Sequence, residues 1–139
     1  MDTSLNEKCH RPLAGIVTDG AHSIKNKVTQ YRGVDLKNGR ELFRESLGNK
    51  TVNVGEFLGV IAGIKYIIEN KYEPRVIYTD SLTAITWVSN KNSASKKRSL
   101  DLKRAEIFLK VMASEIDTIE FVHWSTSKWG EIPADFNLK

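Results

Sequence analysis

The sequence predicts one α/β domain in which a mixed five-stranded sheet packs against helices. Three observations support this fold class. The first third of the chain contains three short segments with strand-type side chains separated by turn signals, as in an antiparallel meander. Helical and strand patterns then alternate, so that each of two later strands follows a helix. The 139 residues suffice for one domain with its own core.

The first three strands are expected at residues 14–18, at residues 28–35 and around Leu42 and Phe43. The apolar run 14–18 is followed by Asp19-Gly20, which predicts that the first strand ends there in a turn. Asn38-Gly39 is typical of a type I′ hairpin between the second and third strands.

The next segment has helical periodicity. Phe57, Ile61, Ile64 and Ile68 fall at i, i+4, i+7 and i+11, which predicts an amphipathic helix over 54–70. Asn53 is expected as its N-cap, which places Glu56 in the first turn.

The remaining chain predicts a strand at 75–79, a helix at 82–88, a helix at 100–114 and a last strand at 119–123. The inward side chains of the 100–114 helix are expected to include Leu100, Ile107, Val111 and Met112. A loop then leads to Pro133, which suits the first turn of a short terminal helix. The predicted order is β-β-β-α-β-α-α-β and a short helix.

Composition bounds the protein class. No apolar run reaches the roughly 18 residues of a membrane span, and the polar first 11 residues lack the apolar core of a secretory signal. The single cysteine, Cys9, excludes an intramolecular disulfide framework. We therefore expect a cytoplasmic protein with a flexible lead-in at 1–12 and one domain at 13–139. The net charge of +4 is compatible with a polyanionic partner.

Four carboxylates occupy comparable junctions: Asp19 after the first strand, Glu56 in the long helix, Asp80 after the fourth strand and Asp135 at the terminal segment. If the first and fourth strands are parallel neighbours, Asp19 and Asp80 emerge at one edge of the sheet, where ligands bind in such folds. Gathered carboxylates repel one another, and divalent cations such as Mg²⁺ relieve that repulsion. Each acid alone also suits a turn, a helix cap or the helix dipole.

Four motifs carry a family resemblance: TDGA (18–21), TVNVGE (51–56), IYTDS (77–81) and WGEIPAD (129–135). Together they resemble type 1 ribonuclease H over residues 13–139, and the WGEIPADF ending is similar to a compact bacterial branch of that family. The resemblance implies a ribonuclease H-like fold. It also implies an endonuclease that cuts the RNA strand of RNA–DNA hybrids and leaves 5′-phosphate and 3′-hydroxyl ends.

The resemblance further implies two divalent metal ions, Mg²⁺ with Mn²⁺ as a substitute, held by Asp19, Glu56, Asp80 and Asp135. Asp19 and Asp80 would hold the metals most directly. Glu56 would contact the leaving-side metal and a ribose 2′-hydroxyl, and Asp135 would hold the attacking-side metal.

The resemblance extends to substrate contacts. Thr51 matches a threonine that binds a DNA-strand phosphate, and Asn53 matches an asparagine that contacts the hybrid in the minor groove. Gly20 and Ser81 lie within the matching motifs and are also expected near the substrate. Val52 and Leu82 depart from the Asn and Gln that relatives often carry, and the segment 21–27 replaces a glycine-rich hairpin.

A loop histidine that assists product release in many relatives is replaced by Ser125. His123, Lys128 and Glu131 are candidates for an auxiliary role, although His123 also suits the end of the last strand. Trp87 is expected to pack in the core.

Residues 91–110 contain seven basic and two acidic residues, a net charge of +5 that exceeds the +4 of the whole chain. This segment is either a solvated helix face or a patch that tracks phosphates, with Lys96, Lys97 and Arg98 as its centre.

Three other functions remain open from the sequence: a catalytically weak or silent module that binds RNA or hybrid, a related nuclease that cuts DNA, and a phosphoacceptor regulator that uses Asp80. The four carboxylates argue against the silent module, and the early antiparallel meander argues against the regulator. The expected partner is RNA–DNA hybrid, with no membrane, and we expect a monomer.

Overall fold

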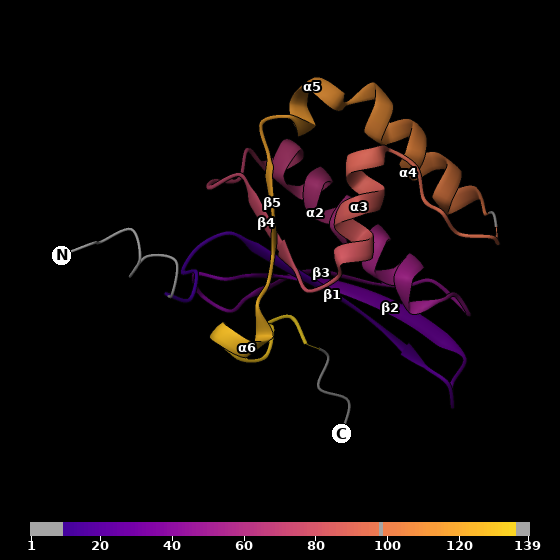
Figure 1. The fold of residues 1–139 in the computed structure, drawn as a ribbon, viewed down its shortest axis with the longest axis horizontal. Helices are drawn as coiled ribbons and strands as arrows, with labels where there is room; N and C mark the ends of the chain where they lie inside the picture. Colours follow the sequence, from indigo (N-terminus) through magenta and orange to yellow (C-terminus); the bar gives the residue numbers. More distant parts are fainter. Residues whose placement is uncertain (1–9, 98, 136–139) are drawn as a thin grey trace.

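The computed structural model describes residues 10–97 and 99–135 of the chain (Figure 1). Its sheet has five strands in the order β3-β2-β1-β4-β5. The strands are β1 (Ile16–Ser23), β2 (Val28–Asp35), β3 (Glu41–Ser46), β4 (Val76–Thr79) and β5 (Glu120–His123). β2 is antiparallel to β1 and β3, whereas β4 is parallel to β1 and β5. The predicted mixed five-stranded sheet is confirmed.

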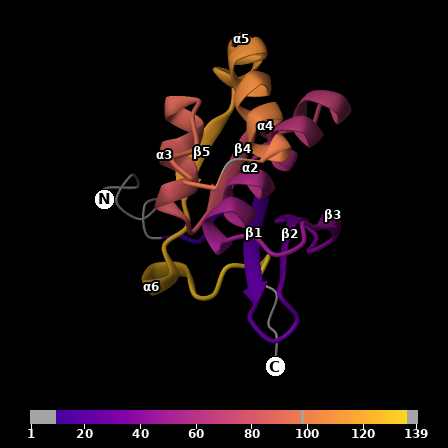
Figure 2. The same ribbon diagram turned by 90° about the vertical axis from the view of Figure 1, so that its right-hand side faces the viewer.

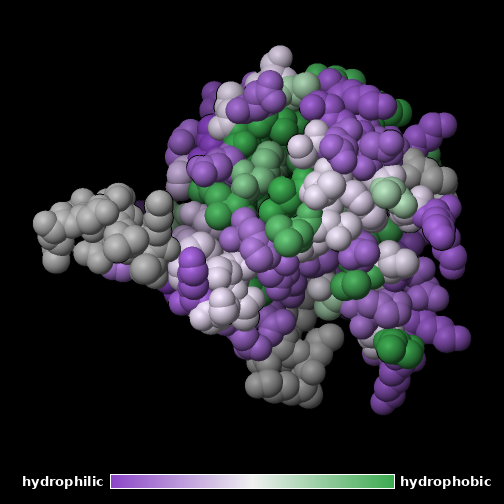
Figure 3. All heavy atoms as spheres, in the orientation of Figure 1, coloured by the Kyte–Doolittle hydropathy of each residue, from purple (hydrophilic) through white to green (hydrophobic). Residues whose placement is uncertain are grey.

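The helices are α2 (Val52–Asn70), α3 (Leu82–Asn90), α4 (Leu100–Val111), α5 (Ala113–Ile116) and α6 (Thr126–Trp129). Figures 1 and 2 show α2, α3, α4 and α5 on one side of the sheet and α6 with the C-terminal segment on the other. In the orientation of Figure 1, apolar side chains gather between β5 and α3, and hydrophilic side chains cover much of the periphery (Figure 3). None of the helices in the described ranges is long and apolar enough to cross a membrane.

A line of glycines lets α2 lie close to the sheet. Gly55, Gly59 and Gly63 recur every four residues and so share one face of the helix. A Cβ at Gly55 would stand 2.7 Å from Thr29 Cγ2, and a Cβ at Gly59 would stand 3.1 Å from Tyr31 Cβ. The backbone of α2 therefore approaches β1 and β2 more closely than larger side chains would allow.

The main core lies between α2 and the sheet. Its members that lack solvent exposure include Ile16, Phe57, Ile64, Ile67 and Ile77. Trp87 joins them against Phe57, with ring centroids 5.5 Å apart, which confirms its predicted packing role. Each such side chain contributes about 1.5–3 kcal/mol relative to an exposed one.

A second, smaller core lies on the opposite face of the sheet. It contains Val17, Val34, Trp124, Ile132 and Ala134. Trp124 is fully buried, and its indole Nε1 donates to the carbonyl of Gly130 at 2.9 Å. This core fixes the C-terminal segment against β1 and β2.

The first hairpins differ from prediction. β1 does not end at Thr18 but continues to Ser23, so Asp19 and Gly20 lie within the strand and the turn falls at 24–27. The predicted type I′ turn at Asn38-Gly39 is wrong, because only Gly39 of these two has a positive φ, at 75°. The connection is a longer loop over 36–40, in which Gly39 N donates to the Asp35 carbonyl at 2.7 Å.

The start of α2 also differs. Thr51, not Asn53, is the N-cap, and its Oγ1 accepts from Val54 N at 3.3 Å. The helix therefore begins two residues earlier, at Val52, and Glu56 lies in its second turn rather than its first.

The inward face of α4 was predicted wrongly. Leu100, Ile107 and Val111 are 60%, 53% and 74% exposed, and only Met112 of the expected set is partly buried. The buried residues are Leu102, Ala105 and Leu109. The helix carries apolar residues on two faces, and the face with Leu102, Ala105 and Leu109 is the one that packs into the core.

The C-terminal region has a helix where a loop was expected, since α6 precedes Pro133. Pro133 and Ala134 form a turn, closed by a 2.9 Å hydrogen bond from Asp135 N to the Ile132 carbonyl. Residues 136–139, where the predicted terminal helix would continue, and residues 1–9 of the predicted lead-in lie outside the described residues.

Candidate active site and nucleic-acid interface

Three of the four predicted carboxylates lie together. One oxygen each from Asp19, Glu56 and Asp80 falls within 4.8 Å of the others. They come from the middle of β1, from α2 and from the residue after β4. The parallel register of β1 and β4 pairs Val17 with Tyr78, and its continuation places Asp19 level with Asp80. The parallel pairing of β1 and β4 therefore brings Asp19 and Asp80 together, although Asp19 lies inside its strand and not at its end.

Gly20 brings the third acid into the cluster. Its backbone N–H donates to Glu56 Oε1. A Cβ at this position would stand 2.7 Å from Glu56 N and 2.9 Å from Glu56 Oε1, so only glycine allows β1 and α2 to approach this closely. Gly20 therefore acts on Glu56 directly, whereas the sequence placed it in a turn.

Asp19 and Glu56 do not ionise independently of their surroundings. Burial and the charge of Asp80 raise the pKa of Asp19 to about 7, and burial with the charges of Asp19 and Asp80 raises the pKa of Glu56 to about 9. Burial and mutual repulsion raise the pKa of both groups, so this pair of carboxyls keeps its protons to higher pH than two separate exposed carboxyls would. The cluster is costly to charge without a cation.

This donor set suits a hard divalent cation. Carboxylate oxygens are the ligands that Mg²⁺ prefers, and it takes few of them while its other positions hold water or substrate oxygens. Asp19, Glu56 and Asp80 offer such oxygens at one partly open site, since Asp80 is exposed while the other two acids are buried. The residues fit a magnesium site.

Asp135 lies beside this cluster without belonging to it. Its charge raises the pKa of Asp19, but its carboxylate is not among the three within 4.8 Å. Asp135 is held in the C-terminal segment, directly after Ala134 of the second core. Long-range packing therefore brings the fourth predicted acid to the site from the opposite face of the sheet.

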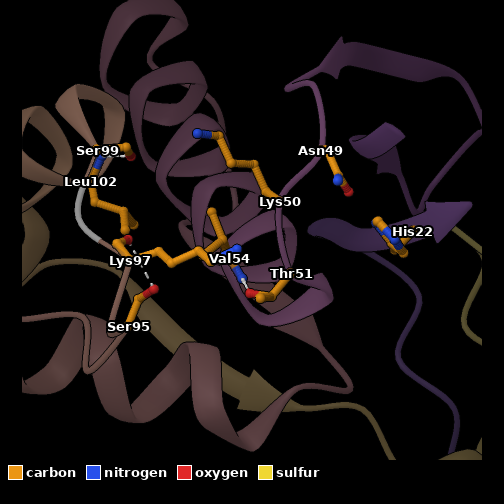
Figure 4. A pocket seen from close by; sticks show the side chains of 9 residues that line it. All are labelled: His22, Asn49, Lys50, Thr51, Val54, Ser95, Lys97, Ser99 and Leu102. Carbon is orange, nitrogen blue, oxygen red and sulfur yellow. Dashed lines mark hydrogen bonds between the residues drawn. The ribbon is translucent and has the colours of Figure 1, made fainter. Parts of the chain in front are cut away.

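A cavity of about 380 Å³ lies between the start of α2 and the loop before α4 (Figure 4). Thr51 and Lys97, both predicted as substrate-binding residues, line it. Its other lining residues are His22, Asn49, Lys50, Val54, Ser95, Ser99 and Leu102. The mixture of cationic and hydroxyl groups is suited to a phosphate.

Sequence reasoning missed the contribution of His22 and Lys50 to this cavity. Lys50 directly precedes Thr51, so chain adjacency was a usable signal. His22 was not detectable in the same way, because its place depends on β1 continuing past Asp19. Its Nδ1 lies 2.8 Å from Thr29 Oγ1, which fixes the ring against β2.

The other predicted substrate residues are dispersed. Asn53 is exposed in the first turn of α2 and does not line the cavity. Ser81 caps α3, with its Oγ accepting from Ala84 N at 3.0 Å. Lys96 is exposed, and Arg98 lies outside the described residues. The two departures, Val52 and Leu82, are 45% and 62% exposed at the starts of α2 and α3.

The candidate auxiliary residues lie at the end of β5 or belong to the C-terminal region. His123 is exposed at the end of β5, aligned with Thr79 of β4, as its predicted place at a strand end requires. Lys128 is exposed in α6, and Glu131 is exposed in the loop after this helix. Among the described residues the cluster includes neither His123 nor Glu131, and an auxiliary role for any of the three stays a prediction.

Comparison with known proteins agrees with this geometry. Residues 18–128 match the family model described as reverse transcriptase-like. The N-terminal RNase H domain of a Mycobacterium tuberculosis protein, solved as a fusion with maltose binding protein, superposes with a TM-score of 0.51 at 19% identity, covering 81% of each chain. LC11-RNase H1, isolated from compost by a metagenomic approach, gives a TM-score of 0.54 at 18% identity, covering 81% of this chain and 84% of the other. The resemblance to type 1 ribonuclease H is thereby confirmed, and the chain belongs to the reverse transcriptase-like family with its ribonuclease H-like fold.

Proposed function

We propose that this protein is a metal-dependent endonuclease that hydrolyses the RNA strand of RNA–DNA hybrids. The products would carry 5′-phosphate and 3′-hydroxyl ends, and residues 13–139 would form the catalytic domain. The observation that carries the proposal is the meeting of Asp19, Glu56 and Asp80 at the edge where β1 and β4 run parallel. The family supports a nuclease of this general kind.

The acidic cluster explains why a cation is needed. Two divalent metals about 4 Å apart would stabilise the attacking and leaving oxygens of an in-line displacement at phosphorus. Asp19 of β1 and Asp80, which follows β4, would be the main ligands of these metals. Glu56 would serve the leaving side and contact a ribose 2′-hydroxyl, while Asp135 would serve the attacking side.

The remaining side chains would hold the substrate. Thr51 and Lys97 line one cavity with His22 and Lys50, so a backbone phosphate of the DNA strand would be bound there. Asn53 in the exposed first turn of α2 and Ser81, the half-buried N-cap of α3, would face the minor groove, where the 2′-hydroxyl distinguishes RNA from DNA. The expected cytoplasmic location and monomeric state stay predictions.

A cleavage assay with three substrates tests the proposal. Labelled RNA–DNA hybrid, double-stranded RNA and double-stranded DNA are each offered to the protein with Mg²⁺ or Mn²⁺. We expect metal-dependent cutting of the RNA strand of the hybrid alone. Asp80→Asn should abolish it, because the amide removes a charged ligand, whereas Asp117→Asn, an exposed acid at the end of α5, should leave it unchanged.

The outcomes separate the alternatives. Cutting of double-stranded DNA would assign the chain to the related DNA-cutting nucleases. Hybrid binding without cutting in either metal would indicate a silent binding module. Undiminished cutting by Asp80→Asn would refute the acidic cluster as the active site.

A further inference from the structure

We propose that Arg32 of β2 is a positioning residue that holds the backbone of Asp135 in place for metal binding. The inference rests on the proposed function, in which Asp135 is a metal ligand. No motif or periodicity in the sequence indicates a role for Arg32, because that role depends on strand register and on contacts with residues 133–135.

Within the part of the C-terminal segment that the structure describes, which ends at Asp135, three hydrogen bonds join Arg32 to backbone carbonyls. Its Nε donates to the Ala134 carbonyl at 2.7 Å, and its Nη2 donates to the carbonyls of Asp135 at 3.1 Å and Pro133 at 3.4 Å. These carbonyls belong to a turn outside any helix or strand. The side chain of Arg32 is only 20% exposed, so these bonds are partly shielded from water.

The sheet register explains how one arginine reaches both the segment and the site. Asp19 and Arg32 are direct partners in the antiparallel pairing of β1 and β2, and so are Val17 and Val34. Directly paired residues, and residues two apart on a strand, share one face of the sheet. This face carries the second core, to which Val17 and Val34 belong.

The C-terminal segment follows the same order. Ile132 and Ala134 pack into the second core with Val17 and Val34. The next residue, Asp135, then lies at the level where Arg32 and Asp19 are paired, and its charge acts on Asp19. The apolar contacts of Ile132 and Ala134 therefore hold the C-terminal segment against the sheet. The hydrogen bonds from Arg32 then fix the position of the Asp135 backbone, which carries the carboxylate.

Arginine suits this task better than other cations. Its planar guanidinium presents five donors in a fixed fork, while lysine offers a flexible point charge. The remaining nitrogen, Nη1, donates to Glu41 Oε1 at 3.2 Å, which anchors the guanidinium from β3. Glu41 also accepts from Arg44 of β3, so Arg44 provides a matched control: it is a second arginine on the same Glu41 anchor.

The test follows the amide signals of Asp19 and Asp135 by NMR during titration of the full chain with Mg²⁺ alone. In Arg32→Gln we expect the midpoint for Asp135 to rise on the order of tenfold, as when other groups that orient a metal ligand are removed. The midpoint for Asp19 should stay near that of the parent. Arg32→Lys should fall between the two, and Arg44→Gln should match the parent.

A double mutant tests whether Arg32 acts on Mg²⁺ binding through Asp135. If Arg32 acts through Asp135, then Arg32→Gln should cause no further loss of Mg²⁺ affinity in an Asp135→Asn background. An unchanged Asp135 midpoint in Arg32→Gln, equal shifts of Asp19 and Asp135, or additive losses in the double mutant would each overturn the inference. So would an Asp135 signal in the parent that does not respond to Mg²⁺.

These readouts need no substrate, so they separate the two proposals. A parent protein that shows the expected Mg²⁺ response but cuts no hybrid would refute the proposed function and leave the role of Arg32 standing. A parent that cuts hybrid while Arg32→Gln titrates and cuts like the parent would refute only the role of Arg32.

Discussion

Gly20 shows how much of the site depends on the absence of a side chain. We expect Gly20→Ala to lower the free energy of unfolding by about 1–3 kcal/mol, because its methyl group would press on the backbone of Glu56 rather than on a movable side chain. Hybrid cleavage should fall as well, since Glu56 would be displaced from Asp19. Urea denaturation and the cleavage assay measure the two effects.

Gly63→Ala is the matched control for that substitution. Its Cβ would stand 3.1 Å from Ile77 Cδ1, the far end of a side chain that can shift. We expect a smaller loss of stability and no loss of cleavage. Equal losses in the two variants would contradict a specific role for the contact between Gly20 and Glu56.

Thr51 combines a structural and a proposed binding role in one hydroxyl. Thr51→Ala should cost about 1 kcal/mol of stability, because the cap on Val54 N is lost. Thr51→Ser should keep the cap and the hydrogen-bonding group, so its stability and hybrid affinity should both stay near those of the parent. If hybrid affinity in Thr51→Ala equals that of the parent, the proposed phosphate contact is wrong, whatever the change in stability.

At the scale of elements, the basic segment 91–110 has two parts: the loop before α4 and α4 itself. Lys97 reaches the cavity beside Thr51, whereas Lys110 lies exposed in the last turn of α4. Ser93 ties this loop to the helix, since its N and Oγ both donate to Glu106 Oε2 at 2.9 and 2.8 Å. Among the described basic residues of this segment, Lys97 is therefore the one that lines the proposed phosphate site.

This division predicts different salt dependences. Lys97→Ala should reduce the slope of log hybrid affinity against log salt by about one, because one phosphate contact is lost. Lys110→Ala should leave the slope unchanged. Fluorescence anisotropy with a catalytically inactive Asp80→Asn background measures both. Identical slopes for Lys97→Ala and the parent would support the alternative view of a merely solvated face.

The elements themselves were largely predictable, and the errors have local causes. Residues 28–35 were found from their strand-type side chains, Tyr31 and Val34 among them, and α2 was found because Phe57, Ile61 and Ile64 recur on one face of the helix. The inward face of α4 was missed because Leu100 and Ile107 form a second apolar stripe that competes with Leu102 and Leu109. Single-sequence periodicity cannot decide which of two stripes meets the core.

Site residues were predictable where they lie near the ends of helices and strands or within motifs. They were not predictable where their position depends on how the strands pair. Asp19, Glu56 and Asp80 were found from strand and helix junctions and from motifs, even though Asp19 proved to lie inside its strand. Arg32 was not, because nothing near it in sequence indicates that β2 pairs it with Asp19. The relation of Asp135 to the other acids likewise depends on the second core, which forms only in the folded chain.

At the scale of the whole molecule, both faces of the sheet contribute to one acidic site. α2 brings Glu56 from the side of the main core, and the C-terminal segment brings Asp135 from the side of the second core. Folding therefore places negative charges together that an unfolded chain would keep apart. Part of the stability gained in the two cores is offset by this repulsion, and cation binding relieves it.

This coupling predicts how stability depends on pH. Burial and neighbouring charges raise the folded-state pKa of Asp19 from 3.8 to about 7 and that of Glu56 from 4.5 to about 9. Because the folded protein then binds more protons than the unfolded chain, the stability of the metal-free protein should fall as the pH rises through this range. Mg²⁺ needs the deprotonated acids, so its stabilising effect should grow with pH.

Urea denaturation at about pH 5 and about pH 9, in EDTA and in Mg²⁺, measures both trends. Glu56→Gln should remove most of the pH-dependent loss in EDTA and weaken the response to Mg²⁺, whereas Glu69→Gln, an exposed acid near the far end of α2, should change neither. Stability in EDTA that rises between these two pH values, or that falls equally in Glu56→Gln, would contradict the raised pKa of Glu56.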